Sequence, residues 1–152
     1  MPEGLTVSNS SCLIVLEAVG QLNLLRQLYS RVNVPETVAK EFGSALPAWC
    51  EVRAVTNQSL VQTLKLDLGT GEAEAIALSI ECSASRLILD DKKARRVARQ
   101  LNQPVTGTLA ILLRAKERGL LSNVRTVLDA LVAANFRVSN TLVQEVLREA
   151  GE

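Results

Sequence analysis

Short apolar runs alternate with longer amphipathic segments along most of the chain. The short runs have the length and composition of buried strands, whereas apolar residues in the longer segments recur every three or four positions, as in helices. A strand followed by a helix, repeated along a chain, is typical of a parallel sheet with helices packed on its faces. We therefore predict an α/β fold, a three-layer α/β/α sandwich around a mostly parallel central sheet.

The expected elements follow from this pattern. Strands are predicted at residues 5–8, 31–34, 51–56, 86–89 and 104–106. Helices are predicted at residues 11–29 (with Gly20 as a kink or interruption) and 35–42. Two further helices begin at caps, one at Thr70 with Ala73, Ile76, Ala77 and Ile80 buried, and one at Asp90 or Asp91 with Ala94, Val97, Ala98 and Leu101 facing the core. The remaining helices are predicted at residues 107–118, 124–135 and 139–149. The last two helices are expected to complete the core or to form a dimer face.

The residue content excludes several kinds of enzyme. The 152 residues suit a single domain spanning residues 1–152. Because the chain has no histidine, it cannot contain a Ser-His-Asp or Cys-His catalytic group or an HExxH zinc site. Its three cysteines lack a CxxC spacing and are expected to be reduced and mostly buried. They are Cys12, Cys50 and Cys82.

Membrane and export signals are also missing from the sequence. The apolar run that begins at Cys12 ends at Glu17, well short of the ~20 residues that span a bilayer. The first four residues, Met-Pro-Glu-Gly, lack the positive charge of a secretion signal. We expect a cytoplasmic protein without a membrane partner.

Positive charge is concentrated in one region. Nine basic and three acidic residues lie between Arg86 and Arg118, a local charge of +6 in a chain of net charge +1. Four of these basic residues share one helical face, and they are the expected RNA-phosphate contacts: Lys92, Arg95, Arg96 and Arg99. The alternative is an ordinary solvated helix face.

Polar residues follow the predicted strands. In a parallel sheet the carboxyl ends of the strands meet at one edge, where α/β proteins bind ligands. The residues expected at this edge are Asn9, Ser10, Glu72, Glu74, Asp90, Asp91, Thr106 and Thr108. Clustered carboxylates without His or Cys favour Mg²⁺ or Mn²⁺. Each acid also sits where acids cap helices, and the pattern alone makes Glu41 a solvated side chain.

Five stretches together resemble the PIN-domain family. Residues 7–13, Val-Ser-Asn-Ser-Ser-Cys-Leu, resemble its usual opening motif Val-Ser-Asp-Thr-Ser-Pro-Leu. The other four stretches occur in the family's order, at residues 34–42, 71–78, 87–96 and 104–109. The resemblance covers nearly the whole chain and is greatest to a prokaryotic, toxin-like PIN subfamily.

The resemblance implies a metal-dependent ribonuclease that hydrolyses single-stranded RNA and is often the toxin of a toxin–antitoxin pair. It implies that Asn9, Glu41, Glu72, Asp90 and Asp91 form the group that binds Mg²⁺ or Mn²⁺, the acids being catalytic. Either Asp90 or Asp91 would be the fourth acid of the family, because one of them can cap the helix while the other faces the cleft. Polar support would come from Ser10, Thr106 and Thr108. It also implies a homodimer and an antitoxin partner.

The opening motif departs from the family at one position, because Asn9 replaces the first aspartate. An amide oxygen can bind a cation but brings no negative charge. The alternative function is therefore a catalytically impaired PIN-like domain that binds RNA or a protein. A phosphoacceptor receiver domain does not fit, since its acidic pair should lie near the start of a domain. A nucleotide-binding loop does not fit either, because the chain has neither GxxxxGK[ST] nor GxGxxG.

Overall fold

A computed structural model describes residues 4–152 of the chain, so residues 1–3 of the predicted domain lie outside the described residues. The strands are β1 (Thr6–Ser8), β2 (Val32–Pro35), β3 (Cys50–Arg53), β4 (Arg86–Ile88) and β5 (Val105–Thr106). The helices are α1 (Ser10–Ala18), α2 (Asn23–Tyr29), α3 (Glu36–Phe42), α4 (Gln58–Leu64), α5 (Thr70–Cys82), α6 (Lys92–Gln100), α7 (Thr108–Glu117), α8 (Arg125–Ala133) and α9 (Asn140–Glu149).

The strands form one parallel sheet in the order β3-β2-β1-β4-β5. Val7 in the central strand β1 pairs with Asn33 of β2 on one side and with Leu87 of β4 on the other. The chain winds outward from β1 first through β2 and β3, and later through β4 and β5. The strand order therefore reverses beside β1, where ligands bind in folds of this type.

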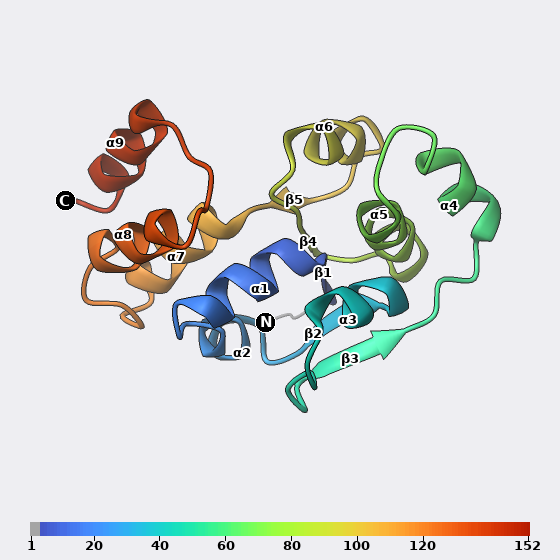
Figure 1. Cartoon of the computed structure of the whole chain (residues 1–152), viewed down its shortest axis with the longest axis horizontal. Helices are drawn as coiled ribbons and strands as arrows, with labels where there is room; N and C mark the ends of the chain where they lie inside the picture. Colours follow the sequence, from blue (N-terminus) through green and yellow to red (C-terminus); the bar gives the residue numbers. More distant parts are fainter. Residues whose placement is uncertain (1–3) are drawn as a thin grey trace.

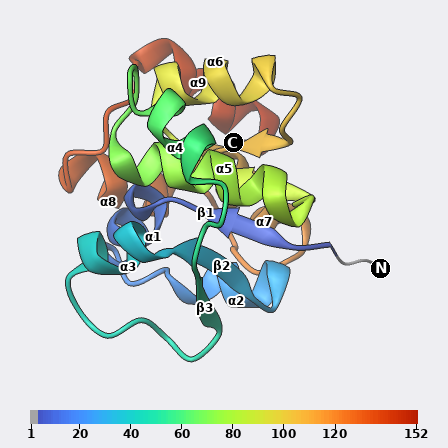
Figure 2. The ribbon, with the colours of Figure 1, turned by 90° about the vertical axis from the view of Figure 1, so that its right-hand side faces the viewer.

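Helices cover both faces of the sheet, which confirms the predicted α/β sandwich. Successive residues of β4 point to opposite faces: Leu87 packs in a core with α5 and α6, whereas Ile88 packs in a core with α1, α2 and α7. In Figure 2, α5 lies above strands β1 and β2, and α2 lies below them.

The C-terminal helices belong to the core beside α1 and α2. Leu128 and Leu131 of α8 and Val146 and Leu147 of α9 are all buried there. In Figure 1, α8 and α9 lie with α7 on the left of the view, and α4 lies at the far right. Core completion, one of the two roles expected for these segments, is therefore confirmed.

Within residues 4–152, none of the helices has both the length and the apolar character needed to cross a membrane.

Several element boundaries differ from those predicted. The expected interruption at Gly20 is confirmed, because this glycine adopts φ +73° after α1 ends and the segment predicted at 11–29 forms two helices. Helix α4 was not predicted, although Asn57 caps it by accepting a hydrogen bond from the Leu60 N–H at 3.1 Å. The predicted strand at 51–56 ends at Arg53, where pairing with β2 stops.

The predicted caps and buried faces also need correction. Gly69 occupies the N-cap of α5, so Thr70 is its first helical residue. Ile80 and Val97 are only half-buried, and Leu101 is 37% exposed because it follows the last turn of α6. The cysteines are free, with Cys12 and Cys50 buried and Cys82 half-buried.

Candidate functional site

The parallel register brings Asn9 and the Asp90–Asp91 pair to the same edge of the sheet. Ser8 pairs with Ile88, and the Asn9 N–H donates to the Ile88 carbonyl oxygen at 3.2 Å. Since β1 and β4 are neighbouring strands, the residues that follow them lie side by side. Residues 9 and 90, far apart in the sequence, thus meet at the point where the strand order reverses.

Asn9 is buried, with 2% exposure, and its amide has a fixed orientation. Its Oδ1 accepts a hydrogen bond from the Ser11 N–H at 2.8 Å and so caps α1. The other end of the amide, Nδ2, donates to Glu72 Oε2 over a longer 3.5 Å. The oxygen that we expected to bind a cation is therefore engaged in the helix cap, and the amide nitrogen faces Glu72.

Glu72 lies in the first turn of α5 and is half-buried. Burial raises its pKa above the usual range, and the negative charges of Asp91 and Glu41 raise it further. These three carboxylates come from different elements, α5, α3 and the end of β4. Their mutual repulsion favours a proton or a cation at this edge.

Asp90 and Asp91 have different partners. Asp90 accepts two hydrogen bonds from Thr108, from the backbone N–H at 2.9 Å and from the hydroxyl at 2.6 Å. Asp91 caps α6, because its Oδ2 accepts a hydrogen bond from the Ala94 N–H at 2.9 Å. Both line a cavity of about 430 Å³ together with Glu72, which we call the acidic cavity. Asp91 therefore both caps α6 and lines the acidic cavity.

Glu41 reaches the same edge from α3. The Ser10 hydroxyl donates to Glu41 Oε1 at 2.8 Å. A Cβ atom on Gly71 would lie only 2.6 Å from this oxygen, so the glycine leaves room for the Glu41 carboxylate beside α5. Glu41 is exposed, as the sequence pattern predicted, and the resemblance had placed it in the acidic group. The structure brings it beside Ser10 and α5.

Basic residues adjoin the acidic cavity. Lys92 and Arg95 line a second cavity of about 310 Å³ together with Asp90, which we call the basic cavity. Arg95 Nη1 donates to the Leu89 carbonyl oxygen at 3.1 Å. Burial and the neighbouring Arg99 lower the pKa of Arg95, while Asp90 acts in the opposite direction. Arg96 and Arg99 are exposed on the same helix and do not line this cavity.

Two of the polar residues expected at this edge lie elsewhere. Thr106 lines a different cavity, together with Tyr29 and Arg86, while the buried Thr108 is the threonine that contacts Asp90. Glu74 Oε1 accepts a hydrogen bond from the Thr37 N–H at 3.2 Å at the start of α3. Thr108 and not Thr106 is therefore placed to support the acids.

Sequence reasoning missed Phe136 and Arg137. Both residues line the acidic cavity and the basic cavity, so they border Asp90 on two sides. They lie in the segment between α8 and α9, far from the five family-like stretches. An aromatic and a basic residue side by side between two predicted helices was the only available signal.

The oxygen atoms at this edge of the sheet are the type that binds a hard divalent cation, but they are widely spaced. Glu72, Asp90 and Asp91 supply carboxylate oxygens around one cavity, which is the ligand type that Mg²⁺ and Mn²⁺ prefer. Over residues 4–152, however, no three acidic or cysteine side chains are close enough together to hold one ion. The carboxylates of the site are therefore the right type of ligand for such an ion, but they lie too far apart to bind one ion together in this structure.

The fold and this edge can now be compared with known proteins. A comparison with curated proteins gave no match. The family model that describes the PIN domain matches residues 5–152, which is nearly the whole chain. That match includes the central strand, the acidic edge and the C-terminal helices. The chain therefore belongs to the PIN domain family.

Proposed function

We propose that the protein is a ribonuclease that uses Mg²⁺ or Mn²⁺ to hydrolyse phosphodiester bonds in single-stranded RNA. The observation that carries this proposal is the acidic cavity, which Glu72, Asp90 and Asp91 line. The basic cavity beside it supplies Lys92 and Arg95 for phosphate groups. The PIN domain family consists of metal-dependent ribonucleases, which supports the same reaction.

Each residue of the acidic edge has a role in this proposal. Glu41, Glu72, Asp90 and Asp91 would hold the ion, which when bound acidifies a water molecule and stabilises charge on the phosphate. Thr108 orients Asp90 through two hydrogen bonds, and Ser10 orients Glu41 through one. The positive charges of the basic cavity attract the RNA backbone and hold it next to Asp90.

Asn9 favours a second candidate function, a PIN domain that binds RNA or a protein without cutting. The residue that would be a negatively charged ligand in the usual motif is here an amide whose nitrogen faces Glu72. A missing anion weakens metal binding, whereas the basic cavity needs no metal to hold phosphate groups.

The experiment that separates the two functions is cleavage of a mixed RNA pool with Mn²⁺ and with EDTA. We would compare the native chain, Asn9→Asp, the double variant Asp90→Asn/Asp91→Asn, and Asp129→Asn. Asp129 is exposed on α8 and lies outside the site, so its variant controls for the loss of one charge. Cleavage that needs Mn²⁺ and disappears only in the double variant supports the nuclease. Cleavage by Asn9→Asp alone supports the binding module.

We also propose that this nuclease acts in the cytoplasm as the toxin of a toxin–antitoxin pair, since PIN domains are often toxins. Induced expression of the native chain in bacteria should arrest growth, and expression of the Asp90→Asn/Asp91→Asn variant should not. Equal growth of both cultures would contradict the toxin role and leave the nuclease activity to be judged in vitro.

A further inference from the structure

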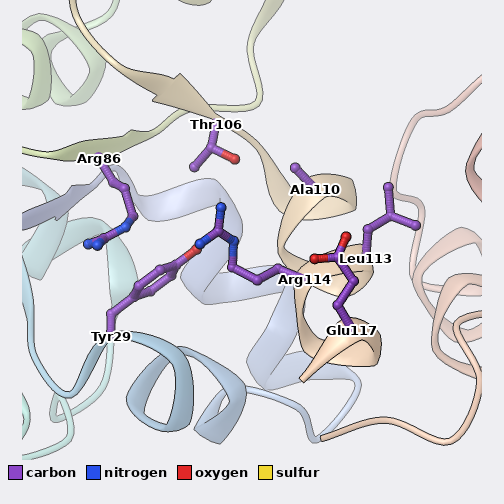
Figure 3. Close-up of a pocket in the computed structure, with 7 residues that line it drawn as sticks. All are labelled: Tyr29, Arg86, Thr106, Ala110, Leu113, Arg114 and Glu117. Carbon is purple, nitrogen blue, oxygen red and sulfur yellow. The ribbon is translucent and has the colours of Figure 1, made fainter. Parts of the chain in front are cut away.

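A third cavity, of about 230 Å³, lies between α2, α7 and the strands β4 and β5. Figure 3 shows two arginines entering it from different elements, Arg86 from β4 and Arg114 from α7, on either side of Tyr29. Thr106 places a hydroxyl group in the same cavity. We call this cavity the arginine pocket.

Arg86 is held in place by its neighbours. Its Nη1 donates to the Thr6 hydroxyl at 2.7 Å, and its guanidinium carbon lies 4.6 Å from the centre of the Tyr29 ring. A guanidinium has five N–H donors, so most of them remain available after this bond. Arg86 is thus positioned in advance for a ligand with several acceptor oxygens.

Arg114 adds a second positive charge that the protein does not neutralise. Among residues 4–152, neither Arg86 nor Arg114 forms an ion pair with a carboxylate. The carboxylate that lines the pocket is that of Glu117, which leaves two positive charges against one negative charge. Burial raises the pKa of Tyr29, while Arg114 and Arg86 lower it, so the charge of both arginines reaches the phenol group.

The pocket is smaller than the cavities of about 300 Å³ or more that hold whole small molecules. Two guanidinium groups with nearby hydroxyl groups match a phosphate, which offers several acceptor oxygens and negative charge. A single phosphate group therefore matches the pocket better than a whole small molecule does.

The pocket extends along α7 from the basic cavity toward the amino end of β4. Ala110 lines both the arginine pocket and the basic cavity, and Asp90 lines both the basic cavity and the acidic cavity. From the arginine pocket, a strand of phosphates could pass over the start of α7 to Asp90.

We propose that the arginine pocket binds a backbone phosphate of the same single-stranded RNA that is cut at the acidic cavity, some nucleotides away from the scissile bond. This inference rests on the proposed function. It assigns Arg114 and Arg86 to RNA binding, and it makes affinity depend on RNA length, because only a strand long enough to span the basic cavity reaches both places.

The test is direct binding of single-stranded RNA in EDTA, where the RNA is not cut. A trinucleotide and an oligonucleotide of about twelve nucleotides would be titrated with the native chain and with Arg114→Gln. We expect Arg114→Gln to weaken binding of the long RNA roughly tenfold and to leave the trinucleotide unaffected. The salt dependence for the long RNA should fall by about 0.7 in the slope of log K against log salt, the value of one phosphate contact.

Two matched variants of α7 and its C-cap sharpen the result. Arg118→Gln removes the same charge from an exposed position that does not line the pocket. The Arg118 charge also lowers the pKa of Tyr29, but less than that of Arg114, so Arg118→Gln should weaken binding less than Arg114→Gln. Glu117→Gln removes the opposing charge and should strengthen binding of the long RNA several-fold. Equal effects of Arg114→Gln and Arg118→Gln would overturn the inference, because general electrostatic attraction would then explain them.

Two further measurements complete the test. The first distinguishes an RNA phosphate from a free nucleotide as the ligand of the arginine pocket, and the second distinguishes failure of the arginine pocket from failure of the proposed nuclease. If adenosine monophosphate binding depends on Arg114 while RNA binding does not, the pocket takes a free nucleotide and the inference is overturned. With Mn²⁺, cleavage that occurs without any dependence on Arg114 overturns the pocket alone. Arg114-dependent RNA binding without cleavage supports the pocket and contradicts the nuclease.

Discussion

Asp91 has two roles, and the sequence alone does not show which of them applies. It caps α6 through the Ala94 N–H, and it also lines the acidic cavity. Asp90 has no such cap and is held instead by Thr108. Both aspartates therefore line the cavity while each also accepts a hydrogen bond from the backbone at the start of a helix.

Substitution of Asp91 should separate the cap from the charge. Asparagine caps helices about as well as aspartate, so Asp91→Asn should change the free energy of unfolding little and should abolish cleavage. Asp91→Ala should abolish cleavage as well and should also lower the free energy of unfolding by about 1 kcal/mol. Urea unfolding and an RNA cleavage assay measure the two effects. Full activity in Asp91→Asn would mean that the residue acts as a cap alone.

Glu72 should make the stability of the metal-free protein depend on pH. Its raised pKa means that the folded state binds this proton more tightly than the unfolded chain, whose value is near 4.5. Stability should therefore fall as the pH rises above about 4.5 and through the folded pKa. In EDTA at pH 7, the free energy of unfolding of Glu72→Gln should be higher than that of the native chain. This difference should disappear below a pH of about 4.5, where Glu72 is protonated in both the folded and the unfolded state.

The same variant should respond differently to metal. Mn²⁺ should raise the unfolding temperature of the native chain, because an ion that binds only the folded state stabilises it, and should raise that of Glu72→Gln less. Thermal unfolding with and without Mn²⁺ measures both effects. Glu145→Gln, at an exposed position on α9, is the matched control and should behave like the native chain. A Glu72→Gln protein less stable than native at pH 7 in EDTA would contradict the expected repulsion.

At the scale of elements, the Glu41 side chain of α3 lies against the first turn of α5 at Gly71. Gly71 is buried within α5, and a Cβ atom there would contact the Glu41 carboxylate. Glycine within a helix normally lowers stability relative to alanine. Glycine at position 71 thus makes room for the Glu41 carboxylate but makes α5 less stable than alanine would.

Gly71→Ala should therefore affect stability and activity in opposite directions. Alanine improves the helix by up to about 1 kcal/mol, and the flexible Glu41 side chain can move aside. Unfolding should occur at an equal or higher urea concentration, whereas cleavage should slow because Glu41 is displaced from Ser10. An active and stabilised Gly71→Ala would show that the position of Glu41 does not matter for cleavage.

Helix α8 begins at a cap that comes from the end of the chain. The Glu152 carboxylate accepts hydrogen bonds from Lys116 at 2.7 Å and from the backbone N–H groups of Val124 and Arg125 at 2.7 and 3.0 Å. Lys116 is the main reason that the pKa of Glu152 falls to about 2. The carboxylate thus ties α7, α8 and the end of α9 together.

The contribution of Glu152 to stability should disappear in acid. A depressed carboxyl pKa stabilises the folded state above the unfolded value of 4.5, and this effect is lost as the pH falls toward 2. Glu152→Gln should therefore lower the unfolding temperature at pH 7 and leave it unchanged near pH 2. Glu149→Gln, exposed in the last turn of α9, is the comparison variant. Equal losses at both pH values would contradict the ionic cap.

At the scale of the whole molecule, two cavities lie at the carboxyl edge of the sheet, and the arginine pocket lies along α7 toward the amino end of β4. Shared lining residues connect the acidic cavity to the basic cavity through Asp90, and the basic cavity to the arginine pocket through Ala110. Most of the basic residues concerned fall between Arg86 and Arg118, where the sequence has its local excess of positive charge. Charge segregated in the sequence thus lies near the proposed RNA path.

We also predict a homodimer. The chain has a mass of 16.4 kDa, so light scattering should give twice this value. Apolar side chains remain on the surface of the C-terminal helices, such as Val132 at 47% and Leu142 at 40% exposure. Val132→Asp and Leu142→Asp would test whether this surface forms the dimer. A native chain at the monomer mass would contradict the prediction.

The sequence by itself determined the layers of the fold and most elements, because apolar periodicity records which side of each strand and helix is buried. Where local signals competed, it was less accurate. The interruption at Gly20 was expected, whereas α4 went unnoticed because two buried residues, Val61 and Leu64, are too few to mark a period.

The tertiary structure decided which polar side chains face each other. The parallel register brought Asn9 beside the end of β4, and the approach of α3 to α5 brought Glu41 to Gly71. It also brought Phe136 and Arg137 to the cavities that Asp90 lines, from a segment outside the five family-like stretches. Periodicity describes burial along one element, whereas a site depends on distances between elements. Those distances are set by packing of the whole chain.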